Sequence, residues 1–113
     1  MASHITITPI AGPVTVTAGG VTLGTSHNAL DLREGSYPPV VYVPRADLDM
    51  GALEKTPRAT TCPWKGAASY YSIRTPGGVL ENAVWSYEDP KADVAAIAGH
   101  LAFYTCLLYT SDA

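Results

Sequence analysis

Short alternating segments separated by Gly and Pro are the feature that most constrains the fold of this chain. Ten Gly and nine Pro are spread over 113 residues, a composition typical of a compact domain with many turns. Between them, apolar residues alternate with Thr, as in residues 4–9 and Val14–Thr17. This period of two is typical of half-buried strands. We therefore expect one mainly β domain.

The same pattern predicts strands along most of the chain. Gly19-Gly20 separates two alternating runs and indicates a hairpin turn, and Pro38-Pro39 precedes an apolar run that suits a central strand. The expected strands cover residues 4–9, 14–18, 21–25, 29–34, 40–43, 60–62, 69–74, 79–81, 83–87 and 101–104.

Helix is expected in two short places only. After Asp89-Pro90, the segment Asp93–Gly99 carries Val94, Ile97 and Ala98 at three- and four-residue spacing, which predicts one short helix near the C-terminus that ends at the glycine. In residues 47–53, an Asp can cap one or two helical turns.

Charge and hydropathy argue against two classes of partner. Seven Lys and Arg residues stand against ten Asp and Glu, and the cations are scattered singly, so we expect no nucleic-acid partner. No apolar run approaches the roughly 18 residues of a membrane span, and the N-terminus has no signal-like core. We expect no membrane partner and a cytoplasmic location.

The last eight residues, 106–113, resemble a translated sequencing adaptor, so we expect a single domain over residues 1–105 and a non-native tail after it. Within residues 1–105 the one cysteine is Cys62, which agrees with a reducing compartment. A lone cysteine also supplies no paired Cys-x-x-Cys turn for zinc, and we expect no metal and no cofactor.

Four motifs together carry a family resemblance. They are Tyr-Val-Pro-Arg-Ala-Asp at residues 42–47, Thr-Cys-Pro-Trp-Lys-Gly-Ala-Ala-Ser-Tyr at 61–70, Asn-Ala-Val-Trp-Ser-Tyr at 82–87 and Ala-Ile-Ala-Gly-His-Leu-Ala-Phe-Tyr at 96–104. With them the chain resembles the domain-of-unknown-function family numbered 427. The resemblance implies a β-tent-like fold, in which two small, twisted antiparallel sheets lean together over a pocket. It implies no activity.

Several side chains are candidates for chemistry. An ammonium at Lys65 close to Cys62 would favour the thiolate and a nucleophilic or redox role, although a single cysteine in a β domain is more often a buried apolar residue. His100 follows the predicted helix, where the helix dipole suits a proton shuttle, and capping or packing is its plainer role. The catalytic candidates are therefore Cys62, Lys65 and His100.

Other side chains are candidates for binding. Arg45 at a strand end can clamp a carboxylate or phosphate, or pair with Glu34 or Asp47 within the protein. With Lys65 it would hold a small anionic metabolite in the pocket between the sheets, with Tyr70 and Trp85 as walls, although such aromatic residues more often fill a core.

Two further functional readings stay open. Gly35-Ser36 followed by Asp47 and Asp49 resembles the Gly-Ser and Asp-x-Asp pattern of nucleotidyltransferases, which hold Mg²⁺ and a triphosphate. The intervening prolines, however, exclude the helix that such enzymes place there. A purely structural or protein-binding domain is the third reading, and the sequence does not separate the three.

Overall fold

The protein is a mainly β domain of two antiparallel sheets. The computed structural model describes residues 4–103 and the backbone of residues 108–110. A seven-stranded sheet has the order β1-β4-β5-β9-β8-β7-β6, and a three-stranded sheet has the order β10-β2-β3. The strands are β1 Ile5–Pro9, β2 Val14–Ala18, β3 Val21–Ser26, β4 Leu30–Glu34, β5 Val40–Val43, β6 Leu53–Cys62, β7 Gly66–Thr75, β8 Gly78–Ser86, β9 Leu101–Phe103 and β10 Leu108–Thr110.

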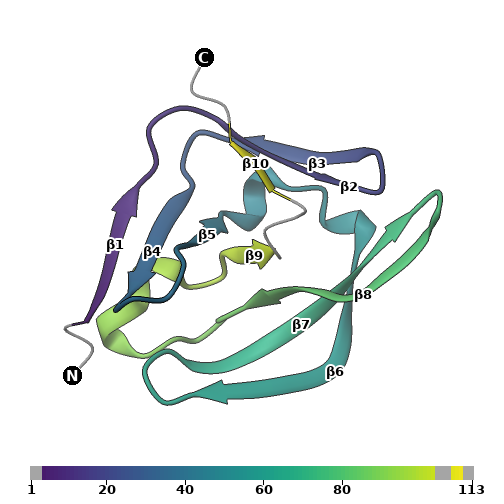
Figure 1. The fold of residues 1–113 in the computed structure, drawn as a ribbon. Helices are drawn as coiled ribbons and strands as arrows, with labels where there is room; N and C mark the ends of the chain where they lie inside the picture. The colour runs from purple at the N-terminus through teal and green to yellow at the C-terminus, as the bar shows by residue number, and fades with distance from the viewer. Residues whose placement is uncertain (1–3, 104–107, 111–113) are drawn as a thin grey trace.

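The seven-stranded sheet consists of two halves joined by β9. Figure 1 shows β1, β4 and β5 on one side and the β6-β7-β8 meander on the other, with β9 between them. β9 pairs with β5 through Tyr42 and Val43 and with β8 through residues 84–86. The three-stranded sheet lies across the top of the view in Figure 1. The expected antiparallel β fold is confirmed, but one of the two sheets is larger than expected.

The turns follow the sequence closely. Gly19 and Gly20 form the β2–β3 turn, both with positive φ, of 56° and 81°, which matches the backbone of a tight hairpin turn. The C-terminal helix is a short 3₁₀ helix, η3 (Ala92–Ile97), with non-helical angles at Val94, and Gly99 follows it with φ 71°. Residues 45–52 form two further 3₁₀ turns, η1 (Arg45–Asp47) and η2 (Met50–Ala52).

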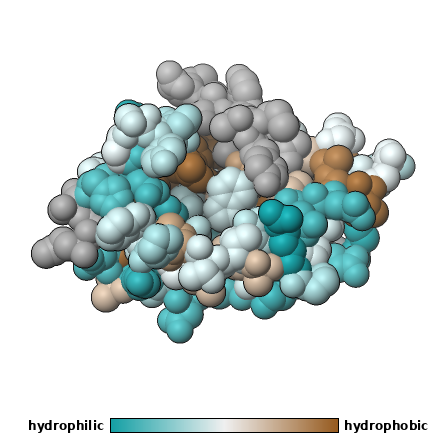
Figure 2. All heavy atoms as spheres, turned by 60° about the horizontal axis from the view of Figure 1, so that its bottom comes forward, coloured by the Kyte–Doolittle hydropathy of each residue, from teal (hydrophilic) through white to brown (hydrophobic). Residues whose placement is uncertain are grey.

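Strand β6 is longer than the sequence pattern predicts, because it begins at Leu53 rather than near Thr60. It is an edge strand, and most of its side chains are exposed, so it carries no buried-exposed alternation that the sequence could reveal. Its charged residues and Pro57 discourage pairing with another chain. Figure 2, which brings the bottom of Figure 1 forward, shows a largely hydrophilic face with small separate hydrophobic patches.

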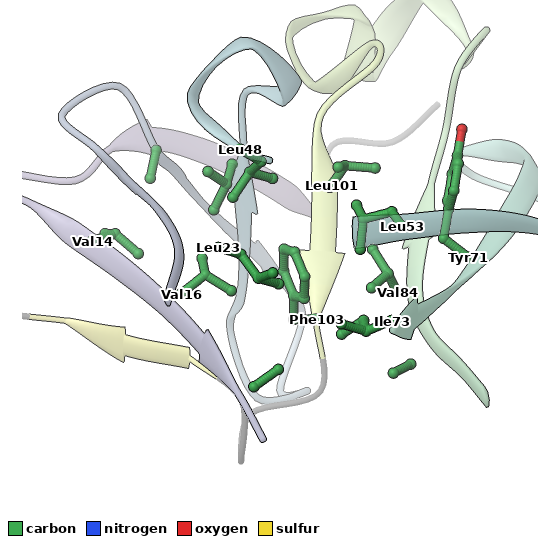
Figure 3. Packing of buried hydrophobic residues seen from close by; sticks show 14 residues of the cluster. Val14, Val16, Leu23, Leu48, Leu53, Tyr71, Ile73, Val84, Leu101 and Phe103 are labelled. Atoms are coloured by element: carbon green, nitrogen blue, oxygen red, sulfur yellow. The ribbon is translucent and has the colours of Figure 1, made fainter. Parts of the chain in front are cut away.

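The first core cluster fills the space between the two sheets. Phe103 is 1% exposed, and Figure 3 shows its ring between Leu23 on one side and Ile73 and Val84 on the other. Because this ring contacts side chains from both sheets, it links the two layers across the domain. No helix in the described part of the chain is long and apolar enough to cross a membrane.

The second core cluster lies on the opposite face of the seven-stranded sheet, under η3. Val94 and Ile97 of η3 pack there against Leu32, Tyr42 and Ala102. Successive residues of a strand point to opposite faces, so Tyr71 belongs to the first cluster and its neighbour Tyr70 packs against the second. The candidate site described below is on this second face.

The non-native tail predicted at residues 106–113 lies largely outside the described residues. Residues 106, 107 and 111–113 are not described, and the backbone of β10 pairs with β2. The non-native origin of residues 106–113 therefore stays a prediction.

A close backbone contact joins β3 to η1. A Cβ placed on Gly24 would lie 2.0 Å from the carbonyl oxygen of Asp47. Around this contact, the Asp49 N–H donates to the Leu23 carbonyl at 2.8 Å, and the Ser26 hydroxyl donates to the Asp47 carboxylate at 2.6 Å. A side chain at position 24 would therefore separate the two sheets at this joint.

We expect Gly24→Ala to destabilise the protein by about 1–3 kcal/mol, the usual effect of overpacking, measured as the free energy of unfolding in urea. Gly77→Ala is the matched control, because its nearest contact is an ordinary 3.9 Å. Equal stability of the two variants would contradict the close β3–η1 contact.

Candidate functional site

A small pocket opens on the second face of the sheet and brings together three of the four predicted ligand-binding residues. Its volume is about 270 Å³. We call it the Lys65 pocket, and it is lined by Val40, Tyr42, Lys65, Tyr70, Trp85 and Tyr87. Lys65, Tyr70 and Trp85 were predicted from the sequence, whereas Val40 and Tyr42 were not considered.

One row of paired residues across four strands forms the aromatic part of this pocket. Tyr42 pairs with Ala102, Ala102 with Trp85, and Trp85 with Tyr70. Ala102 is fully buried, and its small side chain leaves space between Tyr42 and Trp85, which hydrogen-bond to each other. The sequence signal for this arrangement is weak, since Ala102 looks like any strand residue until its neighbours are known.

The phenols of Tyr42 and Tyr87 stay protonated at neutral pH. Burial raises the pKa of Tyr42 to about 12, against a smaller lowering by the hydrogen bond from Trp85. Burial also raises the pKa of Tyr87, and the nearby Tyr42 adds to the effect. A protonated phenol can donate a hydrogen bond, so these walls favour a ligand that carries acceptor oxygens.

Lys65 is held at the pocket by an ion pair that the sequence did not reveal. It is 9% exposed, and its ammonium donates to the Glu34 carboxylate at 2.6 Å. The hydrogen bond from Lys65 lowers the pKa of Glu34, more than burial raises it. Within the part of the chain that the structure describes, this is the one hydrogen bond of the Lys65 ammonium. A lysine has three such donors.

The β6–β7 turn fixes the backbone of Lys65. The turn carries Pro63 and Trp64 and closes at Gly66, whose φ is 110°. The Lys91 N–H donates to the Lys65 carbonyl at 3.0 Å, which ties the turn to the segment before η3. The backbone of Lys65 is thus held both by the β6–β7 turn and by the hydrogen bond from Lys91.

An apolar depression of about 520 Å³ adjoins the Lys65 pocket. We call it the apolar groove; residues 37–40 and 62–64 line it, together with Glu34. Val40 belongs to both depressions. Cys62 is half-buried on the groove wall, and it packs against the second core cluster. Its reactivity stays a prediction.

Arg45 lies apart from the pocket, in a cluster centred on Glu88. Its Nε donates to the Gly99 carbonyl at 3.0 Å, its terminal nitrogen donates to Glu88 at 3.3 Å, and its guanidinium lies over the Tyr71 ring. Tyr71 is on the opposite side of β7 from Tyr70, so the structure does not bring Arg45 and Lys65 together. The pairing of Arg45 is internal, but with Glu88 rather than Glu34 or Asp47.

His100 is also outside the pocket. It follows η3, and its Nδ1 lies 3.1 Å from the Ala98 carbonyl oxygen. Its own carbonyl accepts a hydrogen bond from the Ser86 hydroxyl at 2.7 Å. The bond from Ser86 ties the end of η3 to β8, and the role of the His100 side chain stays a prediction.

The residues of the nucleotidyltransferase-like pattern do not form one site. Gly35-Ser36 precedes β5 and Asp47 follows it, so they are at opposite ends of this strand. Asp47 accepts a hydrogen bond from Ser26, and Asp49 caps η2 through Gly51. Among the described residues, no group of three or more His, Cys, Asp or Glu side chains is arranged to hold a metal ion.

A third depression, of about 510 Å³, lies where the register of β6, β7 and β8 shifts. Three of its polar residues hydrogen-bond to one another, and the one cation of its lining, Arg58, is exposed. The Thr56 hydroxyl donates to the Asn82 side-chain oxygen at 2.7 Å, and the Asn82 N–H donates to the Ser72 hydroxyl at 3.1 Å. The Lys65 pocket combines a largely buried cation with protonated phenols, and is therefore the stronger candidate for a binding site.

Fold and pocket together define a small mainly β domain with a ligand-sized depression on one face of its larger sheet. The family model described as domain of unknown function (DUF427) matches residues 6–110, so the chain belongs to that family and the resemblance in its sequence motifs is confirmed. No curated protein matches the chain.

The Glu88 cluster predicts an acid sensitivity. The Tyr71 hydroxyl donates to Glu88 at 2.6 Å, and with Lys55 and Ser69 it lowers the pKa of Glu88 from 4.5 to about 2. A carboxyl group whose pKa is lower in the folded state stabilises the protein above the unfolded pKa, and this contribution is lost as the pH falls through the folded pKa.

We therefore expect the free energy of unfolding to fall between pH 4.5 and about 2, and Glu88→Gln to reduce this dependence. The effect is moderated by solvent, since the Glu88 side chain is 36% exposed. Urea titrations at several pH values measure it, with exposed Glu81→Gln as the control. An unchanged pH profile in Glu88→Gln would contradict the assignment.

Proposed function

We propose that this protein is a binding module for a small anionic metabolite, which it holds in the Lys65 pocket. The observation that carries the proposal is the convergence of the Lys65 ammonium with the protonated phenols of Tyr42 and Tyr87 in one depression. Ammonium and phenol groups both donate hydrogen bonds, and a carboxylate or phosphate accepts them. Trp85 and Tyr70 supply apolar walls, as is common in ligand sites.

The size of the pocket limits the ligand. At about 270 Å³, the depression is slightly smaller than the usual range for ligand sites. A group of a few heavy atoms, such as a carboxylate with its neighbouring carbons, fits this volume. We further propose that binding takes place in the cytoplasm, a location supported by the single cysteine in residues 1–105.

Glu34 lowers the affinity of the proposed site for anions. Its carboxylate already accepts one hydrogen bond from Lys65 at 2.6 Å, so a bound anion uses the remaining lysine donors and is repelled by Glu34. The affinity of the natural site for a simple anion is therefore modest. Removal of the Glu34 charge should strengthen binding, which is the opposite of what removal of Lys65 should do.

This difference in sign gives the test. Thermal-shift titrations with acetate and with inorganic phosphate measure the dissociation constants of the wild type and of two variants. We expect Lys65→Met to weaken binding about tenfold or more, which is the effect of a lost charge-assisted hydrogen bond, and Glu34→Gln to strengthen it several-fold.

Lys91→Met is the matched control, because it removes the same charge from an exposed side chain, and it should leave the affinity nearly unchanged. Tyr87→Phe removes a donor without disturbing the ion pair and should also weaken binding. No binding of either anion to the wild type, or weaker binding by Glu34→Gln, would contradict the proposed function.

A further inference from the structure

The apolar groove has no role in the binding of a small anion, yet it shares a wall with the Lys65 pocket. Val40 lines both depressions, and the Lys65–Glu34 ion pair joins a residue of the pocket to a residue of the groove. Trp64 in the groove directly precedes Lys65 in the chain. The two depressions are thus neighbours, one rich in donors and the other apolar.

The groove exposes large apolar side chains to solvent. Tyr37 is 73% exposed and Trp64 is 41% exposed, and Pro38, Pro39 and Pro63 lie beside them in the groove. Exposed apolar residues that are gathered in one place, rather than scattered, mark a contact site. Prolines and aromatic rings also lose little conformational freedom when a ligand covers them.

The charges around the groove restrict what can occupy it. Glu34 is the charged residue of the groove lining, and it is neutralised by Lys65 at 2.6 Å and approached by His4 at 3.5 Å. The groove therefore presents little free charge to its occupant. The Lys65 ammonium pairs with Glu34 of the groove lining, so a cation that can anchor an anion lies beside the groove.

We infer that the natural ligand is an amphipathic acid, whose carboxylate lies in the Lys65 pocket and whose apolar chain or ring extends over Val40 into the apolar groove. This inference rests on the proposed function and adds the class of ligand. It also explains how an anion site that Glu34 weakens can reach a useful affinity, because the apolar part contributes by burial in the groove.

A series of straight-chain carboxylates tests the inference, from acetate through butyrate and hexanoate to octanoate. Affinity for the wild type should rise with each added methylene by up to about fourfold, the factor for full burial of a CH₂ group. In Trp64→Ala, acetate should bind as it does to the wild type, but the gain per methylene should fall by about half or more. Val79→Ala removes an exposed apolar side chain elsewhere and should keep the wild-type gain.

The outcomes separate the two proposals. If acetate binds but affinity does not rise with chain length, the small-anion site stands and the amphipathic ligand is wrong. If no acid binds, the proposed function itself fails. The groove could instead be occupied by a second copy of this chain, which sedimentation velocity would detect as a dimer. A wild-type dimer that is dissociated by Trp64→Ala, but not by octanoate, would overturn the inference.

Discussion

The pairing of β9 with both β5 and β8 is the constraint on which the rest of the structure depends. This strand has three residues, yet it joins the two halves of the seven-stranded sheet. Its outer residues, Leu101 and Phe103, enter the core between the sheets, and Ala102 between them faces the second cluster. One short strand therefore fixes both cores and sets Tyr42 and Trp85 on either side of an alanine.

The site follows from this arrangement together with one partly buried ion pair. Removal of a lysine from water is costly unless a counter-charge is close, and Glu34 at the end of β4 supplies it. The pair holds the β6–β7 turn against the other half of the sheet, so its position is part of the fold. Under the proposed function, Glu34 competes with a bound anion for Lys65, so an apolar contribution to binding becomes important.

Much of the fold could be predicted from the sequence because its strands alternate and its turns carry Gly or Pro. The Gly19-Gly20 hairpin and the run Val40–Val43 were correct for this reason. The polar edge strand β6 was predicted too short, because neither of its faces is continuously buried. The late helix was placed correctly but is a kinked 3₁₀ helix, a difference that apolar spacing does not encode.

The site was predicted less well, because it depends on contacts between residues far apart in the chain. Lys65, Tyr70 and Trp85 share a pocket because of the strand register, and their motifs gave a reason to group them. The partners of the charges could not be read from the sequence. Lys65 meets Glu34 across 31 positions, and Arg45 meets Glu88 across 43.

The sequence contains two tryptophans, and they report on the two depressions separately, since Trp85 lines the Lys65 pocket and Trp64 lines the apolar groove. The most direct test of the account is therefore a titration of the ¹⁵N-labelled protein with acetate and then with octanoate, followed at the two indole N–H signals. We expect acetate to shift the Trp85 signal and leave Trp64 nearly unchanged, whereas octanoate should shift both. A Trp85 signal that stays fixed while either acid binds would contradict the account.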